Sequence, residues 1–198
     1  RVKLSFRPLR ADEVQARVNT VGEKGYTLLL YKDARCDQDI LDETVGAMNW
    51  QRRHYEVKGN MYCSVGIRDS ETGEWTFKDD CGTESNTEAE KGEASDSFKR
   101  ACVNWGIGRE LYTKLFIWIP GGTKPTGQKD RRGREIYKLA DPLAHHTVEE
   151  LEVSGGKIVR CVISRTSGSG KDKVIEEVYS YPRRSRSSGN AGAELVEE

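Results

Sequence analysis

The sequence predicts an α+β fold, with a β-β-β-α core in which one long helix packs on an antiparallel β-meander and a C-terminal β-hairpin extension follows. Three observations predict this fold. Residues 49–57, 60–69 and 73–80 alternate between apolar and polar side chains, a helical pattern follows them, and a second pair of alternating segments lies near the C-terminus. The 198 residues are enough to bury a core of this kind.

The meander is predicted by consecutive alternating segments that turn-forming residues separate. In its central segment, Cys63, Val65 and Ile67 alternate with polar or small residues. Lys58-Gly59-Asn60 and residues 69–73 have the composition of tight turns. One face of the meander is therefore expected to pack against the helix that follows.

The long helix is expected to begin near Thr87, with Asn86 or Thr87 as its cap, and to end before Gly106. At 100° per residue, its apolar residues lie in one arc: Ala94, Phe98, Ala101, Cys102 and Trp105. Lys99 lies at the flank of that arc and Arg100 nearly opposite it, so the core needs neither. The pair has two interpretations: cations placed favourably near the end of a helix, or contacts to an anionic partner.

The remaining elements are predicted from periodicity and turn residues. We expect a short amphipathic helix over 11–18, a strand over 26–31, a helix over 37–47 and a strand over 115–120. In the helix over 37–47, the residues expected to face inward are Ile40, Leu41, Val45 and Met48. Near the C-terminus we expect strands over 147–153, 157–163 and 174–181, the first two joined by Gly155-Gly156.

These elements predict four regions: a core over residues 1–120, a basic Gly-rich linker or loop over 121–138, a β-hairpin extension over 139–182 and a disordered tail over 183–198. Tyr55, Tyr62, Trp75 and Trp105 could stack bases, but alternation within strands favours core packing for most of them.

Composition excludes several classes of protein. The chain has 32 basic and 32 acidic residues, so any nucleic-acid binding requires charges that are segregated on the surface. Its five cysteines are scattered without a Cys-x-x-Cys pair, which supports neither a disulfide framework nor a zinc site, and no other metal or cofactor is expected. No apolar run of about eighteen residues occurs, so a soluble, intracellular protein is expected.

The order of several motifs resembles a known family. The matching residues are Lys91, Asp96, Phe98 to Ala101 and Trp105-Gly106, preceded by the meander and by residues 41–46 with Asn49-Trp50. In order and spacing they are similar to the Rad fifty-two type single-strand annealing recombinases, including their phage relatives of the Sak kind. The resemblance covers about residues 5–120.

The resemblance implies a function without a hydrolytic site, namely ATP-independent binding of single-stranded DNA and annealing of complementary strands in homologous recombination. It implies a homo-oligomer, as a ring or a helical assembly. A single-strand binding protein or a recombination nuclease is a further expected partner, and the cytoplasm of a bacterial or phage-infected cell is the expected location. Consistently, the chain lacks a complete phosphate-binding loop of the Gly-x-x-x-x-Gly-Lys-Ser/Thr type.

The resemblance also implies that Lys99 and Arg100 line a groove that holds the backbone of single-stranded DNA. A further arginine of the family, three residues beyond that pair, is Val103 here, and a basic residue before the meander corresponds to Arg35. From the residues themselves, further candidates for DNA contact are Arg52, Arg53, Lys58 and Tyr62. Arg52 and Arg53 straddle one strand, so only one of them can face the groove.

The sequence is also compatible with two other functions. In a magnesium-dependent nuclease, Glu56 and an upstream acid (Asp37, Asp39 or Asp42) would hold the metal while Lys58 steadies the attacking water. Alternatively, the neutral net charge suits an oligomeric interaction protein that binds no nucleic acid.

Overall fold

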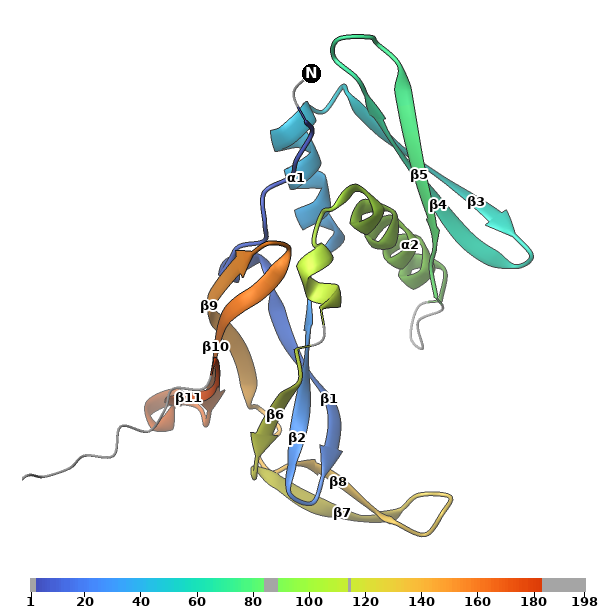
Figure 1. Cartoon of the computed structure of the whole chain (residues 1–198). Helices are drawn as coiled ribbons and strands as arrows, with labels where there is room; N and C mark the ends of the chain where they lie inside the picture. Colours follow the sequence, from blue (N-terminus) through green and yellow to red (C-terminus); the bar gives the residue numbers. More distant parts are fainter. Residues whose placement is uncertain (1–2, 84–88, 114, 183–198) are drawn as a thin grey trace, which may run out of the picture.

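The computed structural model describes residues 3–83, 89–113 and 115–182, which form an α+β fold (Figure 1). In these residues the strands pair antiparallel in sheets of six, three and two strands, and the two α-helices are α1 (Ala34–Val45) and α2 (Ala89–Trp105). The expected α+β class is therefore confirmed. No helix in this part of the chain is long and apolar enough to cross a membrane.

The three-stranded sheet consists of β3 (Trp50–Val57), β4 (Asn60–Arg68) and β5 (Trp75–Cys81), paired in that order. The β3–β4 hairpin turns at Lys58 and Gly59, where both residues have a positive φ, of 52° and 77°. Two successive left-handed residues match the twist of a two-residue hairpin, which fixes the register of the strands. These strands lie within two residues of the ranges that alternation predicts.

Helix α2 packs on one face of this sheet, as Figure 1 shows. The side chains of Phe98, Ala101 and Cys102 have no exposed surface, and neither do those of Cys63 and Val65 on β4. The apolar arc read from the sequence is thus the face that packs. The capping residues expected at Asn86 or Thr87 lie outside the described residues.

The six-stranded sheet brings the two ends of the chain together. Its order is β11-β10-β9-β1-β2-β6, with the strands at Val174–Tyr181, Lys157–Ser167, His145–Ser154, Gln15–Gly22, Gly25–Tyr31 and Ile117–Pro120. Strands β1 and β9 pair only through Gln15 with Thr147 and Ala16 with His146. The C-terminal strands therefore continue the sheet that the N-terminal strands begin, and do not stand apart as an extension.

Residues 121–138, expected as a linker or loop, instead form nearly all of a β-hairpin, which consists of β7 (Thr123–Lys129) and β8 (Glu135–Leu139). Pro125 and the glycines of this segment are residues that normally indicate irregular backbone and not a strand. The hairpin accommodates them because its register shifts between Pro125 and Lys129, where Gly127 has a φ of 78°. The tail expected to be disordered, 183–198, lies outside the described residues.

Two further predictions about the N-terminal elements are wrong. Residues 11–18 do not form a helix: a short 3₁₀ turn, Ala11–Glu13, leads directly into β1. Backbone pairing with β2 and β9 outweighs the weak helical pattern. Met48, expected inward, is 88% exposed because α1 ends at Val45 and Gly46 turns the chain away with a φ of 85°. Two other 3₁₀ turns lie at Arg109–Tyr112 and Gly170–Asp172.

Candidate nucleic-acid interface

The three-stranded sheet has two different faces. We call the side under α2 the covered face and the opposite side the open face. Strand register places Cys63, Val65 and Ile67 on the covered face. The open face carries a mixture of aromatic and polar side chains: Arg53, Tyr55, Tyr62, Ser64, Trp75, Phe77 and Asp79. The residues proposed from sequence divide between these two sides.

Arg100 is a partly exposed residue of α2 that forms an ion pair with Asp96. Its Nε donates to Asp96 Oδ2 at 3.0 Å, while the side chain remains 38% exposed. Burial alone would raise the pKa of Asp96, but hydrogen bonds from Thr83 and Arg100 hold that pKa below its usual value. Among the described residues only Nε has a partner, which leaves the two Nη groups of the guanidinium available to an anion.

Lys99 is tied to a buried charge pair. Its Nζ donates to the carbonyl oxygen of Lys32 at 3.2 Å. Lys32 Nζ in turn contacts both carboxylate oxygens of Asp37 at 2.5 Å, with the side chains 3% and 0% exposed. Burial raises the pKa of Asp37 to about 6, and the charges of Lys32 and Lys99 oppose that rise. Lys99 therefore has a structural role that its position on the helix does not reveal.

Arg35 is exposed at the start of α1, where the Asp33 side chain accepts its backbone N–H at 2.8 Å. Helices α1 and α2 contact each other (Figure 1). The carbonyl that Lys99 contacts belongs to Lys32, three residues before Arg35 along the chain. The structure thus places Arg35 and Lys99 on neighbouring elements.

Arg52 and Arg53 lie on opposite faces of the sheet, as strand alternation requires. The Arg52 guanidinium is 4.8 Å from the centroid of the Phe98 ring, on the covered side. The Arg53 guanidinium is 5.7 Å from the centroid of Phe77, on the open face. Both residues are exposed and β3 is an edge strand, so either guanidinium can meet a ligand at that edge.

Aromatic rings form two stacked pairs on the open face. Tyr55 and Tyr62 lie 5.5 Å apart at 21°, and Trp75 and Phe77 lie 6.2 Å apart at 24°. Core packing, expected for most of the aromatic candidates, is wrong for Tyr55 and Trp75, which are 40% and 37% exposed. It holds for Trp105, whose Nε1 donates to the Val65 carbonyl at 2.9 Å.

One carboxylate organises part of the open face. Asp79 accepts hydrogen bonds from the hydroxyls of Tyr55 and Ser64, each at 2.6 Å. The bond to Asp79 raises the pKa of Tyr55 to about 12, because it stabilises the protonated phenol beside a negative charge. Phe77 is a further aromatic residue of this face that was not among the predicted candidates, although its alternation with Thr76 and Lys78 puts it on the same side of β5 as Trp75.

The residues of the nuclease alternative do not form a metal site. Asp37 is buried against Lys32, whereas Glu56 and Lys58 are exposed at the end of β3 and in the turn beyond it. Among the residues that the structure describes, no three His, Cys, Asp or Glu side chains are grouped so that they could hold a metal ion. The arrangement gives magnesium-dependent chemistry no support.

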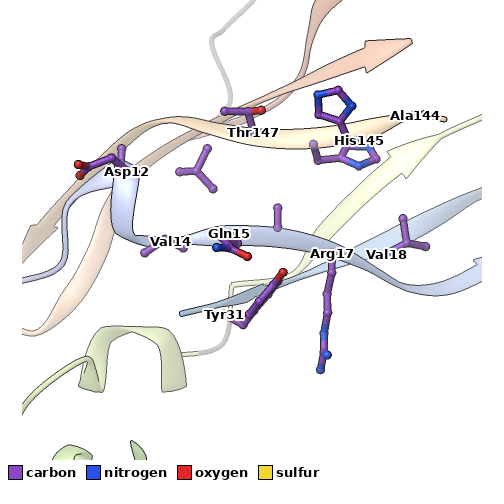
Figure 2. Close-up of a pocket in the computed structure, with 13 residues that line it drawn as sticks. Asp12, Val14, Gln15, Arg17, Val18, Tyr31, Ala144, His145 and Thr147 are labelled. Carbon is purple, nitrogen blue, oxygen red and sulfur yellow. The ribbon is translucent and has the colours of Figure 1, made fainter. Parts of the chain in front are cut away.

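A pocket lies where β1 and β9 separate (Figure 2), and its lining includes Gln15, Arg17, Tyr31, His145 and Thr147. His146 also lines it, but its Nε2 is 2.7 Å from the hydroxyl of Tyr26. Burial and the charge of Arg165 lower the pKa of His146 to about 4. Because the lining mixes charges of both signs, it indicates no particular ligand.

Comparison with known proteins relates this chain to a family. The family described as Rad52/22 family double-strand break repair protein matches residues 7–125. The single-stranded DNA-binding protein DdrA of Deinococcus radiodurans is 28% identical over 143 residues, which cover 64% of this chain and 67% of that protein. No solved structure matches the chain. The match covers the meander, both helices and the Lys99-Arg100 pair, and the chain therefore belongs to the Rad52/22 family of double-strand break repair proteins.

Proposed function

We propose that this protein binds single-stranded DNA and anneals complementary strands in recombination and repair, without nucleotide hydrolysis. The observation that carries the proposal is the Arg100 guanidinium on α2, whose side chain is 38% exposed, with the partly exposed Lys99 at the preceding position of the helix. The name of the relative DdrA, a single-stranded DNA-binding protein, supports the same class of ligand.

In this proposal Lys99 and Arg100 contact phosphates through charge-assisted hydrogen bonds. Such phosphate contacts would position the strand without reading its base sequence. Bases would face outward, so a second strand can test pairing along the bound one. Base pairing then supplies the free energy of annealing, and no ATP is needed.

Arg53 and Tyr62 would contact the same ligand from the open face, where exposed rings offer stacking surfaces that accept any base. A strand that reaches both sides of one sheet must cross an edge of it. At the β3 edge, Arg52 and Lys58 are exposed, and we propose that they contact the backbone there, with Arg35 extending the basic surface along α1.

We also propose a homo-oligomer. Strands β3 and β5 each have one unpaired edge in the described residues, and such edges favour pairing with another copy. Light scattering should show a large assembly at micromolar concentration; a strict monomer, with and without DNA, would contradict this part of the proposal.

The test of the proposed site compares binding with stability. Lys99→Ala and Arg100→Ala should each weaken binding of a labelled single strand and lower the slope of log K against log salt by about 0.7. Because both residues also have structural partners, thermal melts of the same variants are required. Arg100→Lys keeps the charge and should retain most of the slope, although it loses the Nε bond to Asp96.

Lys157→Ala is the matched control, since this lysine is exposed at the start of β10, in another hairpin. Val103→Arg is the reciprocal variant and should tighten binding, because it adds the cation that the family pattern places on this face. If both alanine variants lose stability while their affinity and slope match the control, Lys99 and Arg100 stabilise the helix and do not contact DNA, which contradicts the proposed site. Annealing of two complementary oligonucleotides in ATP-free buffer then tests the second half of the proposal.

A further inference from the structure

The β7–β8 hairpin concentrates positive charge in a chain whose net charge is zero. Between Thr123 and Leu139 there are six cationic residues and only two acidic ones. The cations are Lys124, Lys129, Arg131, Arg132, Arg134 and Lys138. All six are exposed.

Both acidic residues of the hairpin are used in holding its own shape. Asp130 accepts the backbone N–H groups of Arg132 and Arg134 at 2.8 and 3.0 Å, and the Arg134 side chain at 2.8 Å. Glu135 accepts the N–H of Gly127 at 2.9 Å, beside the register shift. The side chains of the other five cations have no hydrogen-bond or ion-pair partner among the described residues.

Two of these cations oppose each other directly. Lys124 and Lys138 are cross-strand partners on the exposed side of the ribbon. Like charges at opposed positions destabilise a strand pair, so folding does not account for this arrangement. The β9–β11 strands differ, because there Arg160 pairs with Glu150 and Arg165 with Glu176.

The hairpin is attached firmly at its base. Thr123 Oγ1 donates to the carbonyl of Glu23 at 3.0 Å, and the N–H of Ala140 donates to the carbonyl of Gly122 at 2.8 Å. Leu139 packs against the core. Figure 1 shows the hairpin projecting from the end of the molecule opposite the three-stranded sheet and α2. Its cations are therefore presented on a defined arm, away from Lys99 and Arg100.

We infer that the β7–β8 hairpin is a second binding element for the phosphate backbone of nucleic acid, separate from the α2 surface. Its unpaired cations and the opposed lysines are complementary to a polyanion, which would relieve their mutual repulsion. The class of ligand rests on the proposed function. The family match ends at residue 125, so most of the hairpin lies beyond it. A single strand and the duplex product share the backbone chemistry that this arm would recognise.

The experiment uses the full chain and two hairpin variants, Lys124→Gln with Lys138→Gln and Arg131→Gln with Arg132→Gln. The control, Lys171→Gln with Lys173→Gln, removes the same charge from exposed positions outside the hairpin. Fluorescence anisotropy over a salt series is measured separately with a single-stranded oligonucleotide and with a duplex. For every phosphate that the variant no longer neutralises, the salt slope should fall by about 0.7 on the single strand or about 0.9 on the duplex.

A lowered slope in both hairpin variants, with melting temperatures equal to the control's, supports the inference, and the ligand that responds identifies the strand form bound. Lys124→Arg with Lys138→Arg should restore the slope. The inference is overturned if the affinities and salt slopes of the hairpin variants match those of the control on both ligands. It is also overturned if the hairpin variants lose oligomerisation while their DNA binding matches the control. If the wild type binds neither ligand, the proposed function fails as well. If the hairpin variants respond but those at Lys99 and Arg100 do not, only the proposed α2 site fails.

Discussion

The covered and open faces of the three-stranded sheet are formed by the same strands but differ in how much of their apolar surface is buried. On the covered face Cys63, Val65 and Ile67 are at most 4% exposed, beneath α2. On the open face the aromatic side chains Tyr55 and Phe77 remain 40% and 41% exposed, and no described element packs on them. Both faces are rich in apolar atoms, so composition alone does not decide which becomes core. The position of the helix does.

The two faces show that the same type of contact, a guanidinium over an aromatic ring, can contribute to stability on one face and to surface chemistry on the other. Arg52 lies near Phe98 and Arg53 near Phe77, at similar distances of 4.8 and 5.7 Å. Phe98 is completely buried, however, while Phe77 is not. The covered pair should therefore contribute to the free energy of unfolding, and the open pair should contribute mainly to the surface chemistry.

The largest effect is expected for Phe98→Ala. Removing this buried ring leaves a cavity between α2 and β4, and should lower the free energy of unfolding by about 3–5 kcal/mol. Urea denaturation monitored by far-ultraviolet circular dichroism measures the change. A loss below about 1 kcal/mol would mean that the covered face is not the core of this region.

Phe77→Ala is the corresponding change on the open face and should cost about 1 kcal/mol, because the ring is partly in water already. Under the proposed function it should also weaken single-strand binding, since it removes one stacking surface. The same denaturation and anisotropy assays apply. Equal destabilisation by Phe77→Ala and Phe98→Ala would contradict the view that only the covered face belongs to the core.

The smallest effect concerns the titration of Tyr55. Its pKa of about 12 lies above the ordinary value of 10, because its hydroxyl donates to Asp79. The contribution of this bond to stability is therefore complete below pH 10 and is lost as the pH rises from 10 to 12. Ultraviolet difference titration should detect the late tyrosine, and Asp79→Asn should return its pKa towards the ordinary value. A titration unaffected by Asp79→Asn would show that the bond does not set the pKa.

Much of the fold could be predicted from sequence where local and tertiary preferences agree. The β3–β4 turn has Lys58-Gly59, and the helical arc around Phe98 coincides with the buried side of α2. Residues 11–18 show the opposite case. Ala11, Val14 and Val18 have helical spacing, yet Val14, Ala16 and Val18 also alternate, and pairing with β2 and β9 selects the strand.

The β7–β8 hairpin could not be predicted because Pro125 and its glycines are normally signs of irregular backbone. A register shift absorbs them, and Gly127 with its positive φ lies at that shift, but a glycine in a polar segment equally indicates a loop. For the candidate site, spacing located Lys99 and Arg100 on the helix but could not show their partners. The hydrogen bond from Lys99 to the Lys32 carbonyl joins residues far apart in the chain.

The short pairing of β1 with β9 bears on the order in which this protein can fold. Since Gln15 meets Thr147 and Ala16 meets His146, the six-stranded sheet closes only after most of the chain has left the ribosome. Until then β1 has β2 as its partner and an open edge on the other side. A fragment cut behind residue 125, where the family match ends, would keep that open edge permanently. It would also lack the side chains of Val148, Ile158 and Ile163, which are buried in the core of the whole chain.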